Sequence, residues 1–241
     1  MTLPKSPKRA AAGAEANRGR PALVPQRSGG RERVAALLGA AANVIHERGY
    51  DAATMAEIAE RADAKIFSLY RFFPTKEVLG EALMQRYAAL YEAAYDEIDA
   101  RACTASADEL ADLLIDFILK IRNQTTALME LLDARSEWSK KRMEFREQAL
   151  KRIAGTLLRR APALPRRTAK DMAVILLNNM KTMVAMTLHK SVPSSPGSPH
   201  ELRLMNRLYL AGRLAGVSSP TGSARPGAAP QFVCRPSARP P

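Results

Sequence analysis

Apolar residues recur every three or four positions through most of the chain, which is the spacing that places them on one face of an α-helix. Gly49 follows the first of these stripes and is typical of a helix end. Strand-like alternation is absent, and residues that favour helices dominate the sequence. The pattern therefore predicts an all-α fold. The first stripe comprises Val34, Leu37, Leu38, Ala41, Ala42 and Ile45.

Two short helices are predicted after this first helix. Thr54 begins one of them, since its hydroxyl can cap free amides while Glu57, three residues later, reaches back in a capping box. Residues 62–64 form a short break, and the next helix runs from Lys65 to Phe72 until Pro74 ends it. Two short helices joined by a tight turn, braced by an apolar helix, present the second helix to the major groove of DNA.

A longer helical body follows these elements. Thr75 can cap a helix that extends towards Ile98. The loop at 191–199 contains three prolines and cannot be helical. We expect residues 31–78 to form a three-helix DNA-binding domain and residues 79–216 to form a helical effector-binding and dimerisation domain. Within that second domain, further helices are predicted at 106–122, 125–133, 137–160, 166–190 and 200–216.

The formal net charge of +13 is concentrated at the two ends of the chain. Residues 1–33 carry eight Lys and Arg against two Glu, and residues 218–241 add three Arg without any acid. Both ends are rich in Pro, Ala, Gly or Arg without apolar periodicity, which predicts disordered tails at 1–30 and 217–241. Because basic tails attract any polyanion, charge alone does not separate DNA from RNA or anionic lipid.

Other features of the composition indicate a cytoplasmic protein. The only cysteines, Cys103 and Cys234, are far apart, which fits a reducing compartment. The sequence has no zinc-ligand spacing, no signal-peptide pattern and no apolar run of about 18 residues. We therefore expect no metal, no cofactor and no membrane as a partner.

Several short motifs identify the N-terminal segment more closely. They are the pair Ala41-Ala42, Gly49-Tyr50, Thr54, Glu57-Ile58-Ala59, Ala62 and the run from Leu69 to Glu77. In this combination, residues 31–79 resemble the DNA-binding domain of TetR-family transcriptional regulators, over about a fifth of the chain. The resemblance implies that the helix from Lys65 to Tyr70 enters the major groove and that Tyr70 and Lys76 contact phosphates. It also implies a dimer made by the last two helices.

Physical chemistry agrees with these implied roles. Thr54 and Thr75, at helix starts, can offer hydroxyls and backbone amides to phosphates. The charge of Lys76 in the first turn of a helix opposes the helix dipole, and this position makes better sense with a phosphate nearby. Arg31 and Arg33, beside the first helix, either extend the contact as a basic arm or belong to a solubilising tail.

The sequence departs from the family pattern at the turn, which usually reads Ala-Gly-Val-Ser and here runs from Ala62 to Lys65. Asp63 must accept the left-handed conformation that glycine adopts easily. Lys65 loses the usual serine cap and adds a positive charge. Phe67 either contacts a thymine methyl or sugar edge or turns inward. The complete set of expected DNA contacts is Thr54, Lys65, Ile66, Phe67, Ser68, Tyr70, Arg71, Thr75 and Lys76, with Arg31 and Arg33 as arm contacts.

The second domain offers candidates for a ligand pocket and a dimer interface. Residues 171–188 are apolar on more than one face, which burial against a partner subunit explains. The candidate pocket comprises Phe117, Met129, Trp138, Met143, Asn179 and Met183, for which ordinary core packing is the alternative. The candidate interface comprises Met186, Leu204, Leu208, Ala211 and Gly212.

The sequence favours a DNA-binding regulator over two rival classes. An enzyme needs a nucleophile with a base, paired carboxylates, a metal cluster or a phosphate-binding loop, and none of these patterns is present. A helical interaction or architectural protein with weak DNA binding is the second rival. We expect a homodimeric repressor that binds a palindromic operator on double-stranded DNA and is released by a small apolar effector.

Overall fold

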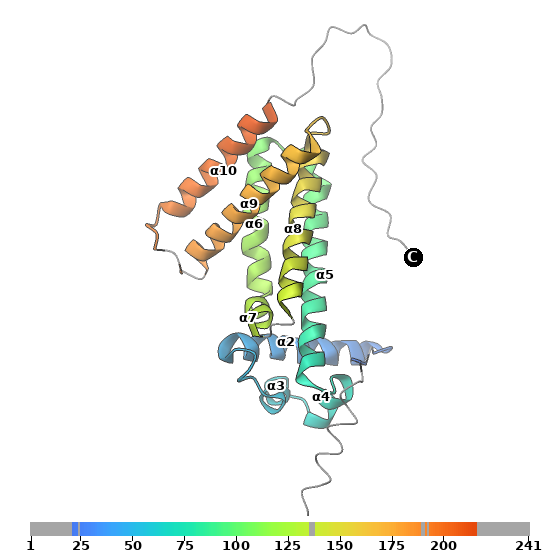
Figure 1. Cartoon of the computed structure of the whole chain (residues 1–241). Helices are drawn as coiled ribbons and strands as arrows, with labels where there is room; N and C mark the ends of the chain where they lie inside the picture. The colour runs from blue at the N-terminus through green and yellow to red at the C-terminus, as the bar shows by residue number, and fades with distance from the viewer. Residues whose placement is uncertain (1–20, 24, 135–137, 189–190, 192, 216–241) are drawn as a thin grey trace, which may run out of the picture. The chain divides into compact units, whose positions relative to one another are not determined.

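A computed structural model describes residues 21–215 apart from 24, 135–137, 189–190 and 192. Within this part of the chain the secondary structure consists of nine α-helices without a β-strand, which confirms the predicted fold class (Figure 1). Most of the two predicted tails lies outside the described residues. The helices are α2 (Ser28–Arg48), α3 (Met55–Arg61), α4 (Ile66–Phe72), α5 (Lys76–Ala102), α6 (Ala107–Gln124), α7 (Leu128–Ala134), α8 (Ser139–Arg160), α9 (Arg166–Thr187) and α10 (Ser198–Ala215).

The chain divides into two compact units. The first comprises the described residues up to Ala89 together with Thr125–Arg142, and the second comprises Leu90–Gln124 and the described residues from Met143 onward. Helix α5 therefore contributes to both units, while α7 belongs with α2, α3 and α4.

The first unit is built on the apolar face of α2. Helix α2 begins at Ser28, inside the stretch predicted as a tail, and ends at Arg48, before Gly49, whose φ is +80°. Its buried face carries most of the predicted stripe, and the helix packs against α3, which in turn contacts α4. The first unit also buries residues of α4 and of the first half of α5. The buried residues include Leu37, Leu38, Ala41, Val44 and Ile45 of α2, Ile58 of α3, Leu69 and Phe72 of α4, and Leu79 and Leu83 of α5.

The second unit is a helical bundle with a continuous apolar core. Its helix α6 begins with a reciprocal capping box, because the Ser106 N–H donates to Glu109 Oε2 over 2.7 Å and the Glu109 N–H donates to Ser106 Oγ over 3.1 Å. The first of these bonds holds the pKa of Glu109 below its ordinary value. The core contains Tyr95 and Ile98 of α5, Leu110, Leu114 and Phe117 of α6, Ile153 and Leu157 of α8, Met172, Leu176 and Met180 of α9, and Leu210 and Leu214 of α10.

Helices α6, α9 and α10 are joined by polar contacts as well as by the core. Arg207 forms a bidentate contact with Asp112, with Arg207 Nη2 2.7 Å from Asp112 Oδ2 and Arg207 Nε 3.1 Å from both carboxylate oxygens. The Asn179 amide donates to Asn206 Oδ1 over 2.8 Å, and Asn206 is buried. These contacts fix the rotation of α10 about its axis, and therefore the face that it leaves exposed. None of the described helices is long and apolar enough to cross a membrane.

Candidate nucleic-acid interface

The start of α3 and the turn that follows this helix largely have the predicted geometry. Thr54 Oγ1 accepts the Glu57 N–H over 3.2 Å, which confirms that Thr54 caps α3. The Glu57 carboxylate does not reach back as predicted for a capping box and instead lies 3.3 Å from Arg48 Nε. Asp63 has a φ of +46°, which confirms that it takes the left-handed position in the turn. The Ala64 N–H then donates to the Ala59 carbonyl over 2.9 Å and closes the turn.

Helix α4 is anchored by one face and exposes the other. Leu69 and Phe72 are buried against the first unit, whereas Ile66, Phe67 and Tyr70 have 42%, 80% and 44% of their surface exposed. Phe67 therefore points outward, which decides between its two predicted orientations. Lys65 and Arg71 are also exposed, and Ser68 is half-buried. The exposed surface of α4 thus combines apolar and aromatic side chains with positive charge.

Lys76 forms its hydrogen bonds within the protein. Its Nζ donates to the carbonyls of Tyr50, Asp51 and Ala53 over 3.0, 3.0 and 3.2 Å, and it lies 4.7 Å from the centre of the Tyr50 ring. An ammonium group has three protons, so these three carbonyls use its full donor capacity. The charge at the start of α5 is therefore stabilised without a phosphate, and Lys76 fastens α5 to the turn that precedes α3.

Three other predicted DNA contacts, Thr75, Arg33 and Arg31, form hydrogen bonds within the protein. The Val78 N–H donates to Thr75 Oγ1 over 3.3 Å, so the predicted cap of α5 is confirmed. Arg33 Nη1 donates to the Asp63 carbonyl over 3.3 Å, which places this arginine beside the turn between α3 and α4. Arg31 Nη1 instead donates to the Gln26 carbonyl over 3.0 Å.

The described residues of Thr125–Arg142 belong to the first unit, an arrangement that no local pattern in the sequence indicates. The Trp138 and Tyr50 rings meet edge-on, with centroids 5.0 Å apart and planes at 70°. Gly80 of α5 makes room for this pair, because a Cβ at that position would lie 3.0 Å from Trp138 Cη2. His46 Nδ1 of α2 also lies 3.1 Å from Glu130 Oε1 of α7. The packing of Trp138 thus reaches Tyr50, the ring beneath Lys76.

The six predicted pocket residues divide between the two units. Met129 and Trp138 belong to the first unit, and Met143 on α8 is exposed. Phe117 and Met183 are buried in the core of the second unit, where the Phe117 ring centroid lies 4.5 Å from that of Tyr95. Asn179 is the polar residue that bonds to Asn206.

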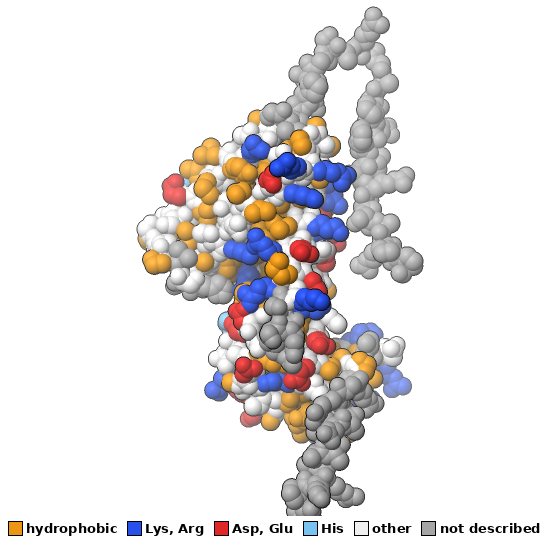
Figure 2. All heavy atoms as spheres, viewed as in Figure 1, with side chains coloured by type: hydrophobic (Ala, Val, Ile, Leu, Met, Phe, Trp, Pro, Cys, Tyr) orange, Lys and Arg blue, Asp and Glu red, His pale blue; other side chains and the backbone are white. Residues whose placement is uncertain are grey.

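Exposed apolar side chains lie on the outer faces of α9 and α10. Figure 2 shows hydrophobic side chains gathered over these two helices. Their buried faces form part of the core, so the exposed residues are the second apolar face that the sequence predicts for 171–188. Of the predicted interface residues, Leu204, Leu208 and Gly212 are exposed, while Met186 and Ala211 are half-buried. The exposed apolar residues here are Val174, Ile175, Leu204, Met205 and Leu208, which we call the α9–α10 face.

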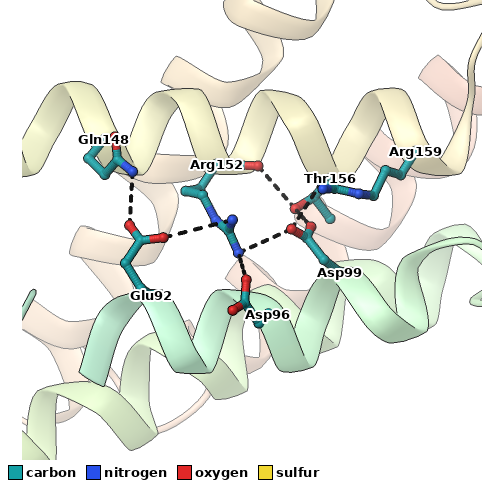
Figure 3. A network of polar contacts seen from close by, with 7 residues as sticks. All are labelled: Glu92, Asp96, Asp99, Gln148, Arg152, Thr156 and Arg159. Atoms are coloured by element: carbon teal, nitrogen blue, oxygen red, sulfur yellow. Dashed lines mark hydrogen bonds and ion pairs between the residues drawn. The ribbon is translucent and has the colours of Figure 1, made fainter. Parts of the chain in front are cut away.

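A polar network that the sequence analysis missed joins α5 to α8 in the second unit (Figure 3). Asp99 is buried, and its carboxylate lies 3.1 Å from Arg152 Nη2 and 2.9 Å from Arg159 Nη1. The hydroxyl of the buried Thr156 donates to Asp99 Oδ1 over 2.6 Å. Arg152 also reaches the exposed Asp96 over 2.5 Å. The spacing of these residues along two helices is ordinary for solvated faces, so the network depends on how the helices pack.

Comparisons with known proteins agree on one family of folds. Residues 37–83 match the model of the family described as bacterial regulatory proteins, tetR family. A transcriptional regulator of the TerR/AcrR family from Aquifex aeolicus VF5 is 19% identical, with a TM-score of 0.59 over 73% of this chain and 99% of that chain. A TetR-like transcriptional regulator from Rhodococcus sp. RHA1 is 18% identical, with a TM-score of 0.55 over 80% of this chain and 100% of that chain.

A third solved structure was obtained with a ligand. It is the transcriptional regulator FadR from Bacillus subtilis in complex with stearoyl-CoA, which is 20% identical with a TM-score of 0.54 over 76% of this chain and 98% of that chain. No curated protein matches the sequence. At these identities the solved structures establish the shared fold.

Proposed function

Because this chain belongs to the TetR family of transcriptional regulators, we propose that it binds a specific palindromic sequence in double-stranded DNA as a homodimer. Bound there, it blocks transcription and is released by a small, largely apolar ligand. Blocking requires only that the dimer occupy its site, so repression needs no further partner.

The exposed face of α4 carries this proposal. A helix that is anchored by Leu69 and Phe72, and that projects Phe67, Tyr70 and Arg71 outward, fits the major groove, which is wide enough for one helix. The exposed side chains of Phe67, Tyr70 and Arg71 on this seven-residue helix do not contribute to the core of the first unit. Their exposure is explained by a partner that covers this face.

Contacts to phosphates follow from the groups around α4. The phenol of Tyr70 and the guanidinium of Arg71 are exposed donors on the same helix, and the hydroxyls of Thr54 and Thr75 lie at helix starts, where backbone amides also point outward. Lys76 enters this proposal as the residue that holds the turn before α3 in place, since its three protons are already donated.

The α9–α10 face supports the homodimer. Its five exposed apolar residues lie on two neighbouring helices whose opposite faces form the core. A cluster of exposed apolar side chains on neighbouring helices is typical of an interaction site. A two-fold contact between two copies of α9 and α10 would bury it, and the same symmetry requires an inverted repeat in the DNA.

The core of the second unit supports an apolar effector. Phe117, Met180 and Met183 are buried in one apolar core, and methionine adapts its shape to bound molecules more easily than branched residues do. FadR from Bacillus subtilis was solved with stearoyl-CoA, whose acyl chain is apolar. Fatty acids and their CoA thioesters are therefore the first compounds to test for release from DNA. The proposed effector role fails if no compound of this class, or of a wider apolar panel, weakens DNA binding.

DNA binding is tested by selecting sites from a random pool with the full-length protein. We expect one inverted repeat to be enriched, and we expect Tyr70→Ala and Arg71→Ala to weaken binding to it. Lys170→Ala is the matched control, because it removes an exposed positive charge from α9 in the second unit. If no sequence is enriched and binding follows only the basic tails, a helical interaction protein with nonspecific DNA binding becomes the better account.

The dimer is tested by sedimentation of the purified protein. Leu208→Glu places a charge at the most exposed residue of the α9–α10 face and is expected to give a monomer. Met143→Glu introduces the same charge at an exposed methionine on α8 and is expected to stay dimeric. Dimeric Leu208→Glu protein would place the interface elsewhere.

A further inference from the structure

The exposed face of helix α4 consists mainly of large apolar and aromatic side chains. Phe67 is the most exposed large apolar residue of the described chain, although the first unit has a core that buries Leu69, Phe72 and Phe73 in the same short segment. Single exposed apolar residues are common on proteins. Here, however, Ile66 and Phe67 precede Tyr70 by four and three residues, so the three side chains share one face of the helix.

The polar groups that read bases are few on this helix. Asn and Gln recognise adenine through paired hydrogen bonds, and Asp and Glu accept from cytosine. The segment Lys65–Phe73 contains none of these four residue types. Its charged residues are Lys65 and Arg71, which can bind guanine or phosphates. The remaining exposed surface is apolar apart from the hydroxyls of Ser68 and Tyr70.

The major groove offers one apolar group for such a surface. Base edges there present hydrogen-bond donors and acceptors, and thymine alone adds a C5 methyl. The positive charges of Lys65 and Arg71 on either side of Phe67, and of Arg33 beside the preceding turn, complement the phosphates that border the groove. The charge and the apolar side chain together favour DNA over an apolar protein partner.

We infer that Phe67 determines sequence specificity by packing against a thymine C5 methyl in each operator half-site. The inference rests on the proposed DNA binding and adds the chemical group that is read. It predicts a thymine at one fixed position of each half-site, recognised through its methyl group. The polar edge of that base pair contributes little, because α4 carries no amide or carboxylate to read it.

Deoxyuridine tests the inference, because it lacks only the methyl group of thymidine. The selected operator is synthesised with each thymine replaced in turn, and the affinity of the full-length protein is measured for every duplex. We expect one position per half-site to weaken binding about fourfold when replaced, which is the effect of losing one buried methyl. Replacement in both half-sites is expected to weaken binding about 15-fold.

Two variants of α4 assign the effect to Phe67. In Phe67→Ala the affinities for the thymine and deoxyuridine duplexes are expected to become equal, whereas Arg71→Ala weakens both and keeps the fourfold ratio. Phe67 is 80% exposed, so its replacement leaves the core intact, and urea denaturation of the variant checks this.

The outcomes separate this inference from the proposed function. An operator at which no deoxyuridine substitution matters, or at which the sensitivity persists unchanged in Phe67→Ala, overturns methyl reading while sequence-specific binding stands. Selection without any enriched sequence overturns the proposed function instead.

Discussion

Replacing Lys76 with methionine removes the ammonium group and keeps the length of the side chain. In the folded protein this ammonium donates to three carbonyls and lies against the Tyr50 ring. Hydrogen bonds to charged groups contribute about 1.5–3 kcal/mol each when they are shielded from water. Two of the three bonds are part-buried, and the bond to Asp51 is exposed.

The expected loss of unfolding free energy in Lys76→Met is about 3 kcal/mol. Two part-buried bonds at the lower end of the range contribute about 3 kcal/mol, and the contact to the Tyr50 ring adds about 0.5 kcal/mol. Removing a positive charge from the first turn of α5 returns about 0.5 kcal/mol through the helix dipole. The protein therefore loses stability in the absence of DNA, which a residue serving only as a phosphate ligand would not cause.

Urea denaturation followed by tryptophan fluorescence measures this effect. Trp138 is the only tryptophan of the chain, and it lies in the unit that Lys76 stabilises. The salt dependence of operator binding is the second measurement, since each phosphate contact contributes about 0.9 to the slope of log K against log salt. We expect Lys76→Met to lower the urea midpoint and leave this slope unchanged.

Lys65→Met is the matched control for Lys76→Met. Lys65 is exposed at the start of α4, so its replacement is expected to change stability by less than about 0.5 kcal/mol. It is expected to reduce the salt slope by about one. A Lys76→Met protein with the normal urea midpoint and a slope reduced by one would refute the structural role and restore the phosphate contact.

Two pairs of substitutions, one pair in each unit, test the remaining contacts. Gly80→Ala is expected to shift the emission of Trp138 and to gain no stability, because the new Cβ would lie 3.0 Å from the indole. Its control Gly39→Ala, which has open space around the new Cβ, is expected to stabilise the protein by about 0.4–1 kcal/mol. Asp99→Ala is expected to lower the unfolding free energy of the second unit by about 2 kcal/mol, since it removes the buried carboxylate that partners the half-buried Arg152 and the Thr156 hydroxyl. Asp96→Ala, at an exposed carboxylate, is expected to change it by less than about 1 kcal/mol, and urea denaturation followed by circular dichroism measures both variants.

The helices of the first unit could be predicted because their signals are local. Thr54 and Thr75 cap helices through bonds to amides three residues away, and the sequence spacing records both. The left-handed turn was predictable for the same reason, since a single position, Asp63, has to supply it. The start of α2 at Ser28 was not predictable, because Gly29 and Gly30 follow it and glycine is a poor helix former.

The contacts of Lys76 inside the protein could not be predicted from neighbouring residues. Its position in the first turn of a helix is unfavourable by the helix dipole alone, so the sequence predicts a nearby phosphate. The carbonyls that stabilise it belong to residues 23–26 positions earlier in the chain. Every residue has a backbone carbonyl, so the sequence does not indicate which carbonyls will bind an ammonium group.

The placement of Thr125–Arg142 in the first unit also depends on contacts between residues that are far apart in the sequence. By chain order this segment lies between α6 and α8 of the second unit, yet its side chains pack in the first. His46 and Glu130 are 84 positions apart, and Trp138 meets Tyr50 at a similar separation, so periodicity within any one helix cannot reveal either contact. Because Tyr50 also lies beneath the Lys76 ammonium, a shift of Trp138 would reach the turn that positions α3 and α4. The emission of Trp138 therefore reports directly on the unit proposed to bind DNA, and a ligand that releases the operator by rearranging this packing must change that emission.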